Sequence, residues 1–278
     1  MSGHDEVIRT RIWEEVSAQD NPFAAAACYC SGYDVYGEIM GNATWAEYLY
    51  LLFQRERPSS VQARMLQDLA VALANPGPRD HSVRAAMNAG VGGSTYASAL
   101  IAALAVGAGQ YGGAHEVAIC MQCWLECGQD FAAWRQRLTQ PVVAGITDIW
   151  GPLEHPPGFD PHGTICPVPV RQTLAHLSGI SHGTALPWLA ENHQKLEEMA
   201  NCPLAFSGVA AATLMDLGFN PKQGEMLYLL LRLPGAAVHA LEQEEFGWRH
   251  YPFFGQGLKL QDDPGPKTDD THDNYVKE

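Results

Sequence analysis

Titratable residues stand at both ends of one apolar segment in the middle of the chain. Asp80 and His81 precede this segment, which runs through Ala-rich sequence from Tyr96 to Ala108, and residues Tyr111 to Glu116 follow it. Binding and catalytic side chains gather on loops and element ends that surround a cavity. The pattern therefore predicts a fully buried helix with chemical groups at both ends.

A later loop carries a further candidate. His162 follows a stretch that begins at Pro157 and contains Pro161, and such a rigid loop could hold an imidazole at a fixed angle. Arg171 lies nine residues on. A plain surface or structural role is the alternative for each of these residues.

Arg232 lies in strongly apolar sequence between Leu229 and Pro234. An unpaired guanidinium buried there would cost several kcal/mol, so the side chain needs an anionic partner. That partner could be Glu225 or Glu242 in a structural salt bridge. It could equally be a substrate carboxylate, which the planar guanidinium binds at two points.

Two further motifs have competing interpretations. Arg249 could also bind a carboxylate, or it could pack on the neighbouring Trp248 by a cation–π contact. Residues Gly107 to Gly112 match the spelling of a dinucleotide-binding loop. That loop needs a preceding strand, whereas a helical segment precedes it here, so a nucleotide site is not predicted.

The cysteines indicate a reducing compartment rather than a disulfide framework. The chain has seven, an odd number, which favours the cytosol. Cys120, Cys123 and Cys127 share one helix face, but no fourth ligand is evident and buried thiols are ordinary core residues. No metal site is predicted.

Composition excludes several classes of function. Hydrophobic residues make up 46% of the 278 positions and charged residues 17%, which is typical of a well-packed globular protein with one large or two modest domains. The net charge of −14 argues against nucleic acid and anionic membranes as partners. The N-terminus has no secretory signal pattern, and no apolar run is long enough to span a bilayer. A cytoplasmic protein is expected.

Helix start signals recur along the chain. Residues 1–20 are predicted to form an amphipathic helix, and residues 23–40 an irregular segment with a turn at 28–33. Thr44 and Glu47 match a capping box, and a second helix opens in the same way at Ser59. Asn220, followed by Pro221, starts the last long helix. The expected apolar side of the first helix consists of Val7, Ile8, Ile12 and Trp13.

Breaks between the helices follow from Pro and Gly. Residues 75–78 end the second helix. Helix resumes over 117–125 and over 172–200, with an interruption near Gly183. A Pro-rich, irregular segment spans 141–169 and suggests a domain change or a loop over a cleft. Pro234 is expected to kink the last helix, and the tail from Gln261 is expected to be loose. With few strand patterns, the sequence predicts an all-α fold.

Several of these fragments, in this order, resemble the citrate synthase superfamily and especially its short members, the citryl-CoA lyases. Residues 231–243 resemble the family's Arg-x-Pro-Gly-x-x-x-His-x-x-Glu-Gln helix, and 111–116 resemble its His-Gly-Gly-Ala-Asn-Glu segment. Residues 157–162 with Arg171 resemble the Pro-Gly-x-Gly-His loop and its arginine. Asp80-His81 matches an upstream Asp-His pair.

The resemblance covers about residues 30–255 and implies an all-α homodimer of the citrate synthase fold. It places a large, discontinuous helical domain at 1–116 and 216–278 and a small helical domain at 117–215. The active site would lie in the cleft between the two domains, where a small di- or tricarboxylate would bind.

The resemblance also implies roles for individual residues. His81 and His162 would hydrogen-bond the keto and carboxylate oxygens of an oxaloacetate-like substrate. Arg171, Arg232 and Arg249 would bind its carboxylates, with Arg249 reaching across the dimer.

The chain departs from the family pattern at its catalytic positions. Tyr111 replaces the first histidine, and Leu204 stands where the family has an aspartate that acts as the base. A leucine cannot accept a proton, so the base would have to be Asp160 or Glu116, or the substrate would need an acidic C–H. The sequence from His162 to Pro167 also lacks the basic residue that usually lies near coenzyme A.

The sequence thus predicts an enzyme that makes or breaks a carbon–carbon bond by aldol or Claisen chemistry, with a coenzyme A thioester as co-substrate. In this hypothesis His162 polarises the carbonyl, His81 positions the keto group and Tyr111 donates a hydrogen bond or proton. Two alternatives stay open: a non-catalytic, carboxylate-sensing paralogue, and a lyase that does not use coenzyme A.

Overall fold

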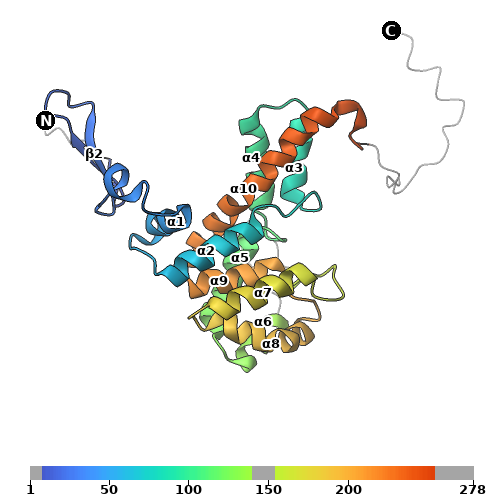
Figure 1. Ribbon diagram of the computed structural model, residues 1–278. Coiled ribbons are helices and arrows are strands. Elements are labelled where there is room, and N and C mark those ends of the chain that lie inside the picture. Colours follow the sequence, from blue (N-terminus) through green and yellow to red (C-terminus); the bar gives the residue numbers. More distant parts are fainter. Residues whose placement is uncertain (1–7, 140–153, 254–278) are drawn as a thin grey trace, which may run out of the picture.

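The computed structural model of the chain describes residues 8–139 and 154–253, and within them the protein is mostly helical (Figure 1). Three short strands and a π-helix come first, followed by ten α-helices and a final 3-10 turn in the described part. The α-helices are α1 (Trp45–Gln54), α2 (Ser60–Leu73), α3 (His81–Val91), α4 (Tyr96–Gly107), α5 (Ala114–Cys127), α6 (Phe131–Thr139), α7 (Val168–Ile180), α8 (Ala185–Ala200), α9 (Phe206–Asp216) and α10 (Pro221–Phe246).

The N-terminal region corrects the sequence-based prediction. Strands β1 (Glu14–Ser17), β2 (Ala25–Cys30) and β3 (Tyr33–Asp34) form an antiparallel sheet, and a π-helix (Val35–Ile39) follows. Neither the predicted helix over 1–20, as far as it is described, nor the irregular segment over 23–40 is present. Strand pairing depends on residues distant in sequence, so Ala and Cys in β2 gave no local strand signal.

The side chains expected on that first helix do not form a core. Ile8 is 95% exposed and Ile12 and Trp13 are each 37% exposed, while Val7 lies outside the described residues. The turn expected over 28–33 is present. Ser31 and Gly32 both have positive φ, the combination that a tight hairpin between twisted strands requires.

The predicted helix caps are confirmed. Thr44 with Glu47, Ser59 with Gln62, and Asn220 each complete a capping interaction at the start of α1, α2 and α10 respectively. Each of these boxes satisfies backbone N–H groups that a helix start leaves without partners. The break near Gly183 separates α7 from α8. Of the Pro-rich segment, residues 154–167 contain no helix and α7 begins at Val168, while residues 141–153 and the tail from Gln261 lie outside the described residues.

One hydrophobic core joins most of the helices. It is built around α5 and α9, whose buried side chains contact those of α2, α7, α8 and α10. Helix α9 is buried on nearly all sides because its residues are small, which allows neighbouring helices to approach closely. Figure 1 shows α10 running from this core outward to the α3–α4 pair.

The α3–α4–α10 unit corrects a second prediction. Helix α4 forms where expected, but it is only partly buried. Ala99, Ala103 and Gly107 face α3 and α10, whereas Tyr96 and Ile101 are each 63% exposed. A periodicity argument could not resolve which side faces outward because the segment is apolar all round. The small core cluster between these three helices consists of alanines.

Helix α10 contacts the end of α2 at its internal proline. The Gly235 N–H donates to the Ala74 carbonyl oxygen at 2.7 Å, and a Cβ at Gly235 would lie only 2.5 Å from that oxygen. One turn later, His239 Nε2 lies 3.1 Å from Asn75 Oδ1. Pro234 and Gly235 thus let two backbones meet closely, which fixes the end of α2 beside the cavity described next.

Candidate functional site

A cavity of about 1010 Å³ lies where α2, α3, α5, α7, α9 and α10 meet. Its walls come from the end of α2, the start of α3, the turn before α5, the loop over 154–162, the residues that lead into α9, and the inner face of α10. A smaller cavity of about 350 Å³ lies between the π-helix and α1, and no predicted site residue lines it. We therefore describe the larger cavity as the candidate site.

Most of the predicted site residues line this cavity: His81, Tyr111, His162, Leu204 and Arg232. They come from five separate parts of the sequence, so the structure brings together what the motifs suggested individually. Two predicted carboxylate-binding residues do not line it. Arg171 is exposed on α7, next to the lining residue Val170, and Arg249 is exposed in the 3-10 turn (Trp248–His250) after α10.

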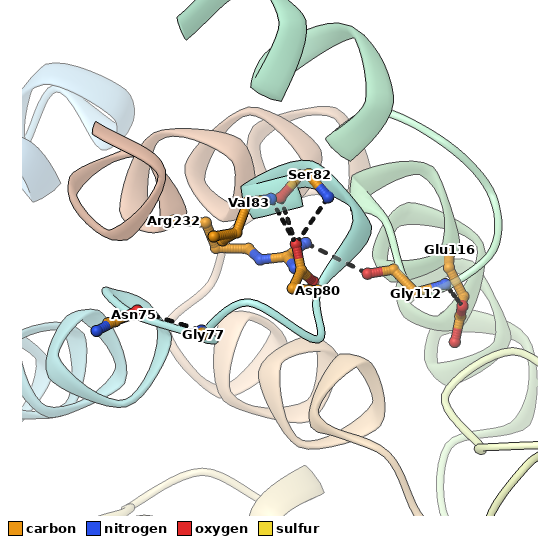
Figure 2. A network of polar contacts seen from close by, with 8 residues as sticks. All are labelled: Asn75, Gly77, Asp80, Ser82, Val83, Gly112, Glu116 and Arg232. Atoms are coloured by element: carbon orange, nitrogen blue, oxygen red, sulfur yellow. Dashed lines mark hydrogen bonds and ion pairs between the residues drawn. The ribbon is translucent and has the colours of Figure 1, made fainter. Parts of the chain in front are cut away.

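Arg232 is buried and ion-paired with Asp80 (Figure 2). The guanidinium side chain is 7% exposed and the carboxylate 13%. The same guanidinium donates to the Gly112 carbonyl oxygen at 3.3 Å and lies 4.8 Å from the ring centroid of Tyr228. Arg232 is therefore fixed in orientation on the cavity wall before any ligand arrives.

The predicted structural partners of Arg232 were wrong. Glu225 lies 3.7 Å from His115, and Glu242 lies 2.9 Å from His239. Both carboxylates are on α10 itself, whereas the partner that the structure provides comes from the Asp80-His81 motif before α3. Because Asp80 and Arg232 are far apart in the sequence, no local pattern predicted their pairing.

Asp80 has two functions at the start of α3. Its side chain accepts hydrogen bonds from the Ser82 and Val83 N–H groups, as an N-cap does, and it faces Arg232. Burial alone would raise the pKa of Asp80, but Arg232, the hydrogen bonds and nearby His81 outweigh it and lower the pKa. The carboxylate is thus ionised at neutral pH and holds both the helix start and the arginine.

A second buried carboxylate, Glu116, connects four segments around the cavity. It is 1% exposed. Its Oε1 accepts from the Gly158 N–H at 2.8 Å and from the Ser207 hydroxyl at 2.7 Å, and its Oε2 accepts from the Gly112 N–H at 2.5 Å. Because both oxygens accept from protein donors, Glu116 serves as an anchor, which disfavours its use as the catalytic base.

The 154–162 loop packs closely on the residues before α9. The Ala205 N–H donates to the Gly158 carbonyl at 2.9 Å, and the Asp160 N–H donates to the Pro203 carbonyl at 2.8 Å. Gly158 has a φ of +88°, and a Cβ there would lie 2.9 Å from the Cys120 sulfur. This close approach places Leu204 against Phe159 with only 1% of its surface exposed.

The sequence motifs did not indicate His155 as a cavity residue. His155 lines the cavity with a side chain that is 6% exposed, and its Nε2 lies 3.7 Å from Glu116 Oε2. Its ring centroid is 5.7 Å from that of Tyr111. The two prolines that follow His155 are a signal that this residue, like His162, is held rigidly.

The cysteines of α5 are buried core residues, as expected. Burial raises the pKa of Cys120, Cys123 and Cys127, the last to about 11, so the thiols stay protonated at neutral pH. Over the described ranges, no group of three His, Cys, Asp or Glu side chains is placed to hold a metal ion. None of the helices in these ranges is long and apolar enough to cross a membrane.

Comparison with solved structures shows what this arrangement of helices resembles. A citryl-CoA lyase from Hydrogenobacter thermophilus matches 95% of this chain and 98% of its own, with a TM-score of 0.68 and 16% identity. The chain has the citryl-CoA lyase fold. The resemblance to citrate synthase-like proteins predicted from the motifs is thereby confirmed for the fold.

Two larger proteins contain the same fold. An ATP citrate lyase from Methanothrix soehngenii, in complex with citrate and coenzyme A, has a TM-score of 0.70 and 16% identity. A Methanosaeta concilii ATP citrate lyase variant, in complex with (3S)-citryl-CoA, has a TM-score of 0.69 and 15% identity. Each match covers 97% of this chain but 43% of the lyase chain. No protein-family model and no curated protein sequence matches the chain.

Replacing Asp80 by Asn should destabilise the protein strongly. The substitution leaves the buried Arg232 charge without a counter-ion, which typically costs about 3–5 kcal/mol. Because the pKa of Asp80 is lowered on folding, its stabilisation is present above the ordinary carboxyl range and is lost as the pH falls through the folded value. Urea unfolding of both proteins at neutral and acidic pH measures the difference.

Glu126→Gln is the matched control, because Glu126 pairs with Arg137 at 3.6 Å while 47% of its side chain is exposed. Loss of this exposed ion pair should lower the free energy of unfolding by less than about 1 kcal/mol. Equal stabilities for Asp80→Asn and Glu126→Gln would contradict a central role for the Asp80–Arg232 pair.

Proposed function

We propose that the protein binds a di- or tricarboxylate in the large cavity and makes or breaks a carbon–carbon bond in it by aldol or Claisen chemistry. The observation that carries this proposal is the preorganised Arg232 on the cavity wall, with His81 and His162 around the same space. A fixed guanidinium with free donor sites is suited to a carboxylate, and histidines can hydrogen-bond its remaining oxygens. The citryl-CoA lyase fold supports the reaction class.

The cavity suits this role although the protein is acidic. A net charge of −14 repels anions at long range, but contact interactions inside a cavity depend on the nearest groups. Asp80 neutralises part of the Arg232 charge, so additional cations would strengthen acid binding. We propose that Arg171, next to the cavity wall, supplies one, and that Arg249 supplies another from a second subunit.

We propose that the cavity lies between two domains. Residues 1–116 and 216–278 would form the large domain and 117–215 the small one, with the cavity between them. In support, the cavity wall combines Asp80, Tyr111 and Arg232 from the first set with His162 and Leu204 from the second. Binding of an acid across both sets would bring them together.

A coenzyme A thioester is the proposed co-substrate. The structures that share this fold include one in complex with citrate and coenzyme A and one in complex with (3S)-citryl-CoA. In this chain, Tyr111 would donate a hydrogen bond where charge develops, and His162 would polarise the carbonyl. Leu204 is buried and apolar, so the chemistry needs a base from elsewhere in the cavity.

The proposal can be tested by supplying citryl-CoA, or oxaloacetate with acetyl-CoA, and following the thioesters by mass spectrometry. The wild-type protein should interconvert them. Leu204→Asn and Leu204→Asp should each stay within about tenfold of wild type, because Leu204 is not the base. Thermal melting verifies that the buried polar side chains are tolerated.

The same variants separate the competing hypothesis of a non-catalytic sensor. In that case the wild type is inert, and Leu204→Asp gains activity while Leu204→Asn does not, since the two differ mainly in the ability to take a proton. If citrate binds but no thioester reacts with any variant, the alternative of a lyase that does not use coenzyme A is favoured.

We further propose a homodimer formed through α4 and α10. Tyr96 and Ile101 on α4, and Val238 and Leu241 on α10, are between 48% and 63% exposed although all four are large and apolar. An apolar face of this kind is typical of a protein interface. Sedimentation should give twice the chain mass of 30.3 kDa, and Ile101→Asp should shift it toward the monomer. A monomeric wild type would contradict the proposal.

A further inference from the structure

We propose that His155 is the proton-transferring catalytic residue of this cavity and that Glu116 is the positioning residue that holds it. The inference rests on the proposed function and supplies what that function lacks, a base in place of Leu204. His155 lies in the Pro-rich segment but in none of the motifs that predicted site residues. It emerges from the arrangement of three segments around one carboxylate.

The imidazole of His155 is placed for proton transfer. His155 lines the cavity, but its side chain is only 6% exposed, so it meets the cavity from a largely desolvated position. Glu116 lies 3.7 Å away on one side and the Tyr111 ring lies 5.7 Å away between centroids. A carboxylate this close to an imidazole stabilises the imidazolium that forms when the ring accepts a proton.

The His155–Glu116 pair is held rigidly by its surroundings. The Glu116 carboxylate accepts from the Gly158 N–H, so the residue that anchors the loop also faces the histidine carried by that loop. Pro156 and Pro157 fill the short stretch between His155 and Gly158 and restrict its backbone. The Gly112 N–H binds the other Glu116 oxygen and places Tyr111 beside the ring. Such preorganisation is what proton transfer in an enzyme requires.

The other candidates for the base are less well placed. Both Glu116 oxygens accept hydrogen bonds from protein groups. Asp160 lines the cavity, but its Oδ1 accepts from the His162 N–H at 2.9 Å and so holds the turn. Leu204 has no titratable group. His155 is the lining residue in the described part of the chain that combines burial, a carboxylate behind it and a side chain made for proton exchange near neutral pH.

In the proposed step, His155 takes and then returns one proton during cleavage of a β-hydroxy thioester. Neutral His155 takes the hydroxyl proton while the C–C bond breaks, so that the alcohol carbon becomes a ketone and the bonding pair passes to the thioester as its enolate. The imidazolium then returns the same proton to the enolate carbon, which gives the acyl thioester. Condensation is the reverse, with His155 removing the α-proton.

The test compares variants in citrate binding by calorimetry and in citryl-CoA cleavage. His155→Ala should lose about 10²–10⁴-fold in kcat, the usual contribution of a general acid–base group, while citrate affinity stays within threefold. Added imidazole should raise the kcat of His155→Ala at least tenfold, because a small base can enter the space vacated by the ring. Rescue of this kind is not expected for a residue with a merely structural role.

Glu116→Gln tests the positioning role. It should lower kcat, and combining it with His155→Ala should cause little additional loss, because residues that act as one unit are not additive. Because Glu116 also anchors three segments of the cavity wall, thermal melting and citrate affinity of Glu116→Gln are measured beside kcat. The control is His176→Ala, which removes a histidine 2.7 Å from Asp68 on the α2–α7 surface and should leave kcat unchanged.

The outcomes separate this inference from the proposed function. Turnover by His155→Ala within threefold of wild type would overturn the role of His155 and leave the proposed function standing. A wild type that binds citrate but cleaves no thioester would also overturn the role of His155, with acid binding intact. A wild type that binds no citrate would overturn both.

Discussion

The buried Glu116 carboxylate is the interaction on which the candidate site depends. A charge that is 99% removed from solvent is tolerated only when protein donors replace its water, and here two backbone N–H groups and one hydroxyl do so. Those donors belong to the turn before α5, the 154–162 loop and α9. The energetic demand of one side chain therefore fixes three segments relative to each other, and the cavity is the space that they enclose.

The Asp80–Arg232 pair meets a similar requirement nearby, since Gly112 contacts both Arg232 and Glu116. Arg232 could not remain in an apolar helix without a counter-ion, and Asp80 could not remain buried without donors. Together they leave a guanidinium that is held in place yet reaches the cavity. An acidic protein can thus present a local anion site, because contact distances rather than net charge decide which ligand is bound there.

Local signals in the sequence predicted much of the fold. The capping boxes at Thr44 and Ser59 and the Asn220 cap lie within one helical turn, so the residues that cause them are visible together. The N-terminal sheet was not predicted because strand pairing is non-local. The exposed side of α4 was not predicted because a segment that is apolar all round has no preferred face.

The sequence predicted the cavity residues that belong to motifs. It did not predict those whose roles depend on tertiary contacts. The motifs placed His81, His162 and Arg232 correctly around one cavity. The partner of Arg232 and the position of His155 depend on segments far apart along the chain, and no spacing rule links them. The resemblance to citryl-CoA lyases predicted the fold, which the comparison with a solved citryl-CoA lyase confirms.

The most direct test of the account is a calorimetric titration of citrate into the wild type and into Arg232→Lys, with Arg137→Lys as the matched control. The lysine keeps the charge opposite Asp80 but loses the planar fork. The account predicts saturable binding to the wild type and to Arg137→Lys, and roughly 10–100-fold weaker binding to Arg232→Lys, the loss expected for charged hydrogen bonds. No binding to the wild type, or equal affinity for all three proteins, would contradict a carboxylate site at Arg232.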